Sequence, residues 1–313
     1  MRKFLLLATI LFFAFTGLAL AGYPAKTIKI IVPSKAGGST DTSARLFINA
    51  AKRHMKGANF VIKNVPGSGG QKGFEEIANS KPDGYTIGMM FTPQIVAHIV
   101  SKRARYTLDD FHVMGNMGKD PLIIAVPKNS PFKNLKEFID AARTKKLTVA
   151  VNGIGSDDFV AAKKFENLTG AKFNLLPTKG STEQKALILG GHVDGSFMNI
   201  TQLHAQHKAG TAHIIALLDS KRSYILPDLP TAEELGYPVD MTATRGFVTP
   251  KGVPEDTAKK LDKLLEDVMN DPEFIAACKK DVIILKHMKG KEYHDYLVGL
   301  QAEIQKFFDS TPW

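Results

Sequence analysis

The sequence is poor in cysteine. Its 313 residues include a single one, Cys278, so no disulfide can form within the chain. Cys278 lies in a segment, 272–280, whose apolar pattern predicts an amphipathic helix. A thiol in such a place is typical of a packed core rather than of a nucleophile. We therefore expect the stability of the fold to come from the size of its hydrophobic core.

Signatures of common enzymes and metal sites are also missing. The sequence contains no Walker A run, no GxGxxG motif after a strand and no HExxH motif. Ser39, Ser68 and Ser156 lack the flanking glycines of the GxSxG motif. His204 and His207 stand three residues apart, but no Cys, Asp or Glu near them completes a metal-binding set. The sequence therefore predicts no metal, no cofactor and no enzymatic activity.

Long apolar runs are absent except at the N-terminus. Two basic residues precede the apolar segment 4–15, and Ala19-Leu20-Ala21 supplies the small residues of a cleavage signature. This pattern predicts a signal peptide over residues 1–21, removed before Gly22. A transmembrane anchor is the alternative, but small residues close the segment and no basic cluster follows it. No cysteine lies near the cut, so we expect export without a lipid anchor.

Acidic residues are fewer than basic ones. The chain has 31 Asp and Glu against 41 Lys and Arg, which gives a formal net charge of +10. Such an excess is compatible with nucleic acid, an anionic surface or anionic ligands as partners. Export argues against nucleic acid, and the lysines are dispersed without a basic–aromatic stripe. We expect a solvated surface that weakly attracts anions.

Apolar, β-rich runs alternate with helical patterns along the chain. Strands are predicted at 27–33, 59–64, 85–91, 122–126, 147–151, 195–198, 214–218 and 246–249. Helices are predicted at 40–55, 71–79, 157–169, 182–189, 255–270, 272–280 and 291–308. The alternation is typical of an α/β fold with parallel sheets flanked by helices. A mature chain of about 290 residues exceeds one comfortable core, which predicts two domains.

One strand–turn–helix pattern occurs twice. Residues 31–41 read IVPSKAGGSTD and residues 149–157 read VAVNGIGSD, with Gly38-Ser39 aligned on Gly155-Ser156. Glycine lets a backbone approach a ligand, and the start of the following helix offers unpaired N–H groups. The pair therefore indicates two facing anion sites at the carboxyl ends of strands. Either turn alone is also explained as an ordinary capped turn.

Several longer motifs occur in order across the mature chain. They include VPSKAGGSTDTSAR at 32–45, NVPGSGGQKGFEEIANSKPDGYTIG at 64–88, GIGSDDF at 153–159, PTKGSTE at 177–183, GGHVDGSF at 190–197, LPDLPTAEELGYP at 226–238 and TPKGVP at 249–254. Together with Tyr23-Pro24 and Arg222, they make the chain resemble the substrate-binding proteins of tripartite tricarboxylate transporters, also called the Bug family. Each motif is a modest signal, but their order along the chain is specific.

The resemblance implies a two-lobe type II periplasmic-binding-protein fold, or Venus flytrap, with hinge strands between the lobes. Lobe 1 is expected to comprise residues 22–118 and 250–313, lobe 2 residues 119–249, and the hinge residues 121–126 and 247–249. Members of the family capture a carboxylate between the lobes and deliver it to membrane permease subunits. The resemblance therefore implies a monomeric solute-binding protein that serves transport in the periplasm and binds a small carboxylate.

Two other functions remain open from the sequence. The chain could be a ligand-sensing module that engages a membrane sensor kinase, and nothing in its residues separates sensing from transport. It could also be a secreted hydrolase acting on an anionic substrate, which would need a nucleophile within reach of a general base. Asp41 beside Ser39 is the best such pair, and it matches no catalytic signature.

The resemblance also implies which residues contact the ligand. The first loop and the opposing loop of the other lobe hold the carboxylate through backbone N–H groups and hydroxyls, whose bonds to a charged acceptor are strong. The predicted ligand-binding residues are Ala36, Gly37, Gly38, Ser39, Thr40, Asp41, Thr92, Gly155, Ser156, Asp157, Thr178, Lys179 and Asn199. Lys179 either adds a positive charge to the site or points to solvent. The segment 66–70 is either a plain turn or a further wall of the cleft.

Two features depart from the family pattern. Thr178 stands where the family usually has Tyr, and Phe159 stands where a His is common. Asp157 and Asp158 begin the helix of the second loop, so with Asp41 three carboxylates lie near the expected anion site. A ligand with several negative charges would be repelled unless these acids turn away or bind a cation. We therefore expect a ligand with one or two carboxylates, in which an ammonium or hydroxyl could bind to an aspartate.

Overall fold

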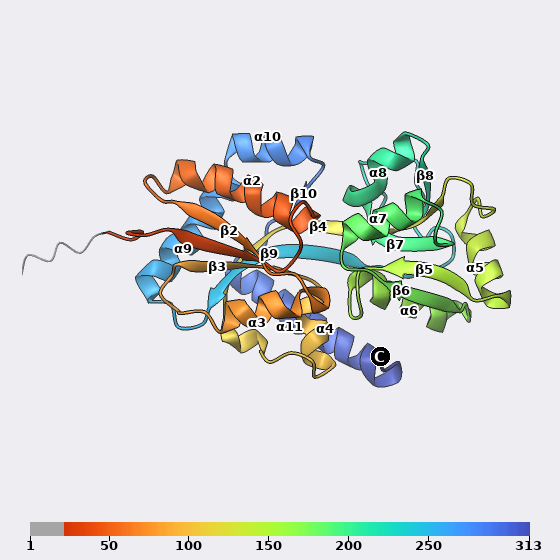
Figure 1. Ribbon diagram of the computed structural model, residues 1–313, viewed down its shortest axis with the longest axis horizontal. Helices are drawn as coiled ribbons and strands as arrows, with labels where there is room; N and C mark the ends of the chain where they lie inside the picture. Colours follow the sequence, from red (N-terminus) through yellow and green to blue (C-terminus); the bar gives the residue numbers. More distant parts are fainter. Residues whose placement is uncertain (1–21) are drawn as a thin grey trace, which may run out of the picture.

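The computed structural model describes residues 22–313, whose elements form two lobes lying side by side (Figure 1). The signal peptide predicted over residues 1–21 lies outside the described residues. Two long strands, β4 (Phe111–Pro127) and β9 (Thr242–Pro250), run where the lobes meet. We call the lobe that contains the N-terminal strand the first lobe and the other the second lobe. In residues 22–313, no helix is apolar over a length that would cross a membrane.

The first lobe has a mixed sheet covered by helices. Its elements are β1 (Ile28–Val32), α2 (Ser39–His54), β2 (Phe60–Asn64), α3 (Gln71–Ala78), β3 (Thr86–Phe91), α4 (Gln94–Val100), α9 (Glu255–Met269) and α10 (Pro272–Lys280). The strand order is β2-β1-β3-β9-β4, with β1 parallel to β2 and β3, and β9 antiparallel to both of its neighbours. Ile28 and Ile30 of β1 are buried in one cluster with Phe47 of α2 and Leu261 of α9. The apolar faces of these helices thus cover the sheet.

The second lobe repeats this arrangement. Its elements are α5 (Leu135–Thr144), β5 (Leu147–Val151), α6 (Asp157–Thr169), β6 (Phe173–Pro177), α7 (Ser181–Leu189), β7 (Gly195–Asn199), α8 (Ile200–Lys208) and β8 (Ala212–Leu218). β5 is parallel to β6 and β7, whereas β4 is antiparallel to β7 and β8. Parallel pairs therefore occur in both lobes, as predicted, and antiparallel pairs accompany them. The antiparallel pairs arise because β4 and β9 run in opposite directions between the lobes.

Strand β4 belongs to both sheets. It pairs with β9 as far as Pro121, which faces Thr242, and from Leu122 onward it pairs with β7 and β8. All residues from Asp120 to Val126 are buried. The change of sheet falls at the first residue of the hinge predicted over 121–126.

The second hinge predicted over 247–249 is misplaced. Phe247 pairs with Met89 of β3, well inside the sheet of the first lobe. The chain enters that sheet at Thr242, where β9 begins. The predicted position came from the resemblance to the family, whereas the crossing lies at the start of β9. The assignment of whole segments to lobes, 22–118 with 250–313 and 119–249, stays a prediction.

Five α-helices and strands escaped the sequence patterns, namely α4, α5, β6, α8 and β10 (Ile284–Leu285). α4 reads QIVAHIV, and six of its seven residues are buried. A helix buried on all sides has no polar face, so the 3.6-residue alternation is lost. β6 lies at the edge of its sheet and has a single buried residue, Phe173, so it lacks a strand's alternation as well.

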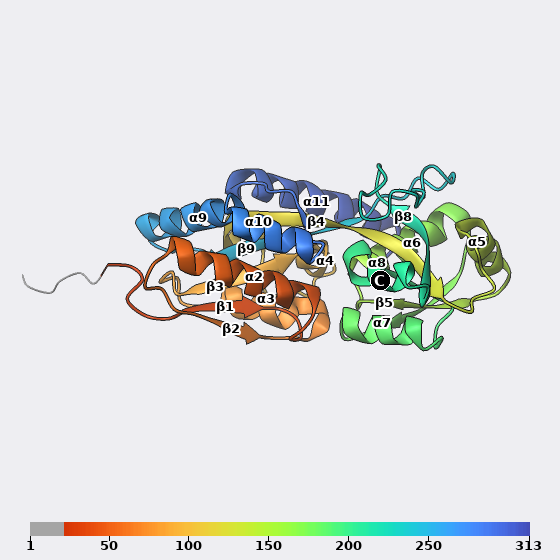
Figure 2. The same ribbon diagram turned by 90° about the horizontal axis from the view of Figure 1, so that it is seen from above.

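The C-terminal helix α11 (Gly290–Ser310) contacts both lobes. Near its start, the hydroxyl of Tyr293 lies 2.8 Å from Thr244 Oγ1 on β9. Beyond its end, the ring of Trp313 lies 5.7 Å from the ring of Phe159 on α6, measured between centroids. In both views the C-terminus lies beside the second lobe (Figure 2). The end of the chain therefore packs against the lobe opposite to the one that holds the start of α11.

Candidate functional site

A cavity of about 1040 Å³ lies between the two lobes, and we call it the interlobe cavity. Its walls include the residues at or just after the carboxyl ends of β1, β3, β5, β6 and β7. This is the edge at which open α/β sheets bind ligands. Nine of the predicted ligand-binding residues line it: Ala36, Gly38, Ser39, Thr40, Thr92, Asp157, Thr178, Lys179 and Asn199.

The first loop brings hydrogen-bond donors to the cavity. Gly38 precedes α2 and has no side chain, so no cap satisfies the N–H groups of the first turn. Ser39 Oγ accepts a hydrogen bond of 3.0 Å from Arg245 Nη2, which leaves the hydroxyl hydrogen free to be donated. Ser34 Oγ, at the end of β1, is buried and has no hydrogen-bond partner among the described residues. These donors, at the positive end of the α2 dipole, favour an anion.

The second loop is a capped strand-to-helix turn, the alternative that the sequence left open. Ser156 is fully buried, and its Oγ accepts a hydrogen bond of 3.1 Å from the N–H of Phe159. Gly155 faces Ala97 and Trp313 instead of the cavity. Neither Gly155 nor Ser156 lines the interlobe cavity. Ser156 therefore caps its own helix, and donation by Gly155 and Ser156 to a ligand stays a prediction.

Asp157 lines the cavity, together with Asn152, Gly153 and Ile154 of the same turn. Its Oδ2 accepts a hydrogen bond of 2.8 Å from Asn199 Nδ2, and its Oδ1 lies 3.4 Å from Gln94 Nε2. Burial raises the pKa of Asp157 to about 6, although Asn199 and the charge of Arg245 act against this rise and Asp120 adds to it. The second loop thus presents a buried acceptor where a second anion site was predicted.

The other two predicted acids turn away from the cavity. Asp41 accepts hydrogen bonds of 2.8 Å from Arg45 Nε and 3.0 Å from Asn64 Nδ2. Burial acts in the opposite direction, but these bonds and one from a backbone N–H lower the pKa of Asp41. Asp158 accepts a hydrogen bond of 2.9 Å from Gln184 Nε2, and burial raises its pKa well above the ordinary value. Asp41 does not line the interlobe cavity, so its contact with a ligand stays a prediction.

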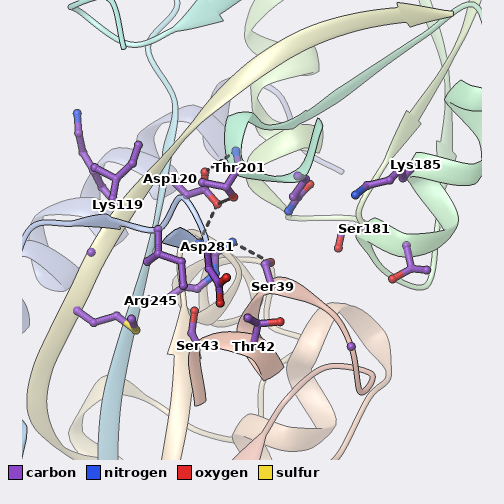
Figure 3. Close-up of a pocket in the computed structure, with 17 residues that line it drawn as sticks. Ser39, Thr42, Ser43, Lys119, Asp120, Ser181, Lys185, Thr201, Arg245 and Asp281 are labelled. Carbon is purple, nitrogen blue, oxygen red and sulfur yellow. Dashed lines mark hydrogen bonds and ion pairs between the residues drawn. The ribbon is translucent and has the colours of Figure 1, made fainter. Parts of the chain in front are cut away.

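Arg245 is the main residue that the sequence patterns missed. It lies on β9, and its Nη1 makes an ion pair of 2.9 Å with Asp120 Oδ2 on β4 (Figure 3). Asp120 is 1% exposed and also accepts a hydrogen bond of 2.6 Å from Thr201 Oγ1. The guanidinium therefore sits at the crossing strands and links them to Ser39 of the first loop. A lone arginine in the apolar run of β9 was the available signal.

The remaining predicted residues form the walls. Thr92 Oγ1 lies 2.9 Å from Thr244 Oγ1, and Asn199 Nδ2 donates to the carbonyl of Asp120 at 2.9 Å. Lys179 is exposed to solvent. The segment Pro66–Gly70, predicted as either a turn or a wall, does line the cavity.

Comparison with known proteins places the chain in a family. Residues 44–298 match the family model described as the tripartite tricarboxylate transporter family receptor. The chain belongs to this receptor family. BugT of Bordetella pertussis is 30% identical to the chain over 262 residues, which cover 82% of the chain and 80% of BugT. The protein is therefore a solute receptor and not an enzyme, as the sequence predicted.

Solved structures agree on the fold. MatC from Rhodopseudomonas palustris, solved with bound malate, superposes on the receptor with a TM-score of 0.82 at 22% identity, covering 91% of this chain and 99% of MatC. An R. palustris protein solved with adipate gives a TM-score of 0.85 at 24% identity, with coverage of 92% and 97%. The receptor thus has the predicted two-lobe type II fold of periplasmic binding proteins.

A smaller cavity of about 340 Å³ adjoins the interlobe cavity of the receptor. The two share Ser39, Ser181, Thr182, Gln202 and Arg245. Figure 3 shows residues that line the smaller cavity. Gly37, a predicted ligand-binding residue, lines the smaller cavity only. On the opposite side Lys185 of α7 lines it, and burial lowers the pKa of this lysine.

The described part of the receptor holds no group of three or more His, Cys, Asp or Glu side chains able to bind a metal. His204 Nδ1 lies 3.2 Å from the carbonyl of Thr201, and His207 Nδ1 accepts the N–H of Ile214 at 3.1 Å. Both histidines therefore have partners in and around α8.

Proposed function

We propose that the receptor captures a small carboxylate in the interlobe cavity and delivers it, in the periplasm, to the membrane subunits of a tripartite tricarboxylate-type permease. The ligand is a monocarboxylate, a dicarboxylate or an amino-acid-like acid. One observation carries the proposal: the start of α2 is uncapped and lines the cavity next to Arg245. Backbone N–H groups, the Ser39 hydroxyl and a guanidinium form the donor set that a carboxylate requires.

The charges around the interlobe cavity support an anionic ligand. Four basic side chains line it, those of Lys35, Arg103, Lys179 and Arg245, against the two acidic ones of Asp157 and Glu183. Burial lowers the pKa of His98, another wall residue, to about 4, so its imidazole is neutral at pH 7. The excess of positive charge raises the local concentration of anions. The bound malate and adipate of two proteins with the same fold are small dicarboxylates of this kind.

The position of the cavity supports capture by closure. Walls from both lobes meet across it, and β4, β9 and α11 run from one lobe to the other. A ligand that bonds to Ser39 on one side and to the second lobe on the other binds the closed form more tightly than the open one. This difference in affinity is what stabilises the closed form. A closed, loaded receptor is the form that a permease would recognise.

Calorimetric titration of residues 22–313, unfolded and refolded to remove carried-over ligand, tests the capture step. The panel contains mono-, di- and tricarboxylates, acidic amino acids and aromatic acids, each beside its neutral amide. We expect at least one carboxylate to bind while its amide does not. At 100 times its dissociation constant it should add about 2.7 kcal/mol to the free energy of unfolding. Equal binding of amides, or no binding of any carboxylate, would overturn the proposal.

An uptake assay tests delivery. Cells that express the two membrane subunits of a tripartite tricarboxylate transporter should take up the labelled carboxylate only when the receptor is present. A matched strain carries a receptor with Arg245→Ala, which should fail at binding. Uptake that is the same with and without receptor would rule out delivery and would leave sensing as the role of the captured ligand.

A further inference from the structure

Two buried side chains, one from each lobe, meet at the wall of the interlobe cavity. Gln94, on α4 of the first lobe, is 2% exposed, and Asp157, on α6 of the second lobe, is 3% exposed. Both line the cavity. Their single contact, between Gln94 Nε2 and Asp157 Oδ1, is 3.4 Å long, which is beyond the usual range for a hydrogen bond of this type.

One oxygen of each side chain, Gln94 Oε1 and Asp157 Oδ1, lacks a close hydrogen-bond donor. Gln94 Oε1 is buried and has no hydrogen-bond partner among the described residues. Asp157 Oδ1 has the long contact alone, while Asn199 occupies Oδ2. A buried acceptor without a donor costs about 1–3 kcal/mol, and more when it is charged. A group that supplies N–H or O–H to both oxygens would therefore remove an existing penalty.

The neighbouring acid, Asp158, has the close donors that Asp157 Oδ1 lacks. Asp158 is equally buried, but its Oδ2 accepts hydrogen bonds of 2.9 Å from both the N–H of Asn152 and Gln184 Nε2. It does not line the interlobe cavity. Two adjacent aspartates thus differ in one respect: Asp158 is supplied with donors by the fold, and Asp157 faces the space where a ligand would lie.

We propose that Asp157 and Gln94 form a subsite for a hydrogen-bond donor of the ligand, so that the receptor selects carboxylates bearing an ammonium or hydroxyl group. This inference rests on the proposed function. The carboxylate lies against the start of α2, and the donor reaches the acceptor pair on the other side. Because Gln94 and Asp157 belong to different lobes, the donor also links the two lobes when the cavity closes.

Matched ligands test the subsite. Succinate, malate and aspartate share one carbon skeleton and carry hydrogen, hydroxyl or ammonium at the same carbon, and glutarate, 2-hydroxyglutarate and glutamate form a second series. In the series that binds, we expect a donor-bearing acid to bind at least tenfold more tightly than its parent diacid. Titration calorimetry at pH 7.5 gives the ratio of the dissociation constants.

Three variants locate the selectivity. Asp157→Asn should bring the ratio to within about threefold while the parent diacid still binds. Gln94→Met removes the unpaired oxygen and should also lower the ratio. It keeps the test valid if Asp157→Asn fails to fold. Asp158→Asn is the matched control, and it should keep the wild-type ratio. The ratio is the decisive readout because a merely structural change would weaken both ligands alike.

The outcomes separate the two proposals. If parent diacids and donor-bearing acids bind equally well to the wild type, or if Asp157→Asn weakens both by the same factor, the donor subsite is wrong and carboxylate capture stands. If no carboxylate binds the wild type, carboxylate capture itself fails and the subsite fails with it.

Discussion

The turns before α2 and α6 follow the same backbone course but end on different residues. Gly37 has a φ of 78° and Gly155 a φ of 79°, and each stands two residues before its helix. The next residue is Gly38 in the first turn and Ser156 in the second. Ser156 caps its own helix through the N–H of Phe159, whereas Gly38 has no side chain with which to do so.

This difference changes what each turn offers to a ligand. A capped helix start has fewer free N–H groups, so α6 is a poorer anion site than α2. The first helical residue lines the interlobe cavity in both turns, and it is Ser39 in one and Asp157 in the other. One turn therefore presents donors and the other an acceptor. Two similar turns do not make two similar sites, because one residue at the cap decides the chemistry.

The largest effect is expected for Arg245, whose guanidinium donates to Ser39 of the first turn. Arg245→Ala removes the partner of Asp120, which is 1% exposed, and the bond to Ser39. We expect ligand affinity to fall at least a hundredfold and the free energy of unfolding to fall by about 3 kcal/mol, because a buried carboxylate loses its ion pair. Titration calorimetry and urea denaturation measure the two effects.

Arg222 provides a control for this substitution. Its ion pair with Glu234 is 2.9 Å long, but both side chains are nearly half exposed. Arg222→Ala should change stability by less than about 1 kcal/mol and leave affinity unchanged. A similar loss in both variants would show that overall charge, rather than the position of Arg245, attracts the ligand.

The sequence predicted the turn before α2, which presents donors, better than the turn before α6, which presents an acceptor. In the first turn, Ala36, Gly38, Ser39 and Thr40 were expected at the ligand and do line the cavity. In the second turn, letter-by-letter alignment matched Gly155-Ser156 to Gly38-Ser39. The structure shifts this match by one residue, since six residues separate β1 from α2 and five separate β5 from α6.

Other features depend on contacts that no local pattern contains. Arg245 meets Ser39 across 206 positions of sequence, and their contact requires β9 to cross between the lobes. Gln94 lies on a short helix without an amphipathic pattern, so no helix was predicted there. The periodic elements were predictable because their residues repeat a local rule. The floor of the cavity was not predictable, because strands that are far apart in the sequence form it.

A change of pH is expected to have an intermediate effect on the free energy of unfolding. The sign is opposite for Asp41 after the first turn and Asp157 after the second. Hydrogen bonds lower the pKa of Asp41, so its contribution to stability is present at neutral pH and is lost as the pH falls through this pKa. Burial raises the pKa of Asp157 to about 6, so its favourable contribution is present below about pH 4 and is lost as the pH rises through 6. At pH 7.5 Asp41→Asn should destabilise the ligand-free receptor, and Asp157→Asn should stabilise it by on the order of 2 kcal/mol.

Urea denaturation at several pH values measures both effects. The gain from Asp157→Asn should disappear near pH 4, where the wild-type carboxyl is protonated in both the folded and unfolded states. The groups that act on Asp157 are Arg245, Asp120, Asp158 and Asn199, and none of these is altered by the substitution. A gain that is independent of pH would mean that Asp157 is ionised without cost in the folded receptor.

The smallest effects are expected for the two serines, and they sharpen the comparison most directly. Ser39→Ala removes a donor that faces the cavity, so ligand affinity should fall about tenfold while stability stays within about 0.5 kcal/mol. Ser156→Ala removes a helix cap, so stability should fall by about 1 kcal/mol while affinity changes less than about twofold. Equal losses of affinity in both variants would restore two equivalent anion turns. If the two effects separate, a serine before a helix and a serine in its first turn have different roles: the earlier one serves the fold, and the later one serves the ligand.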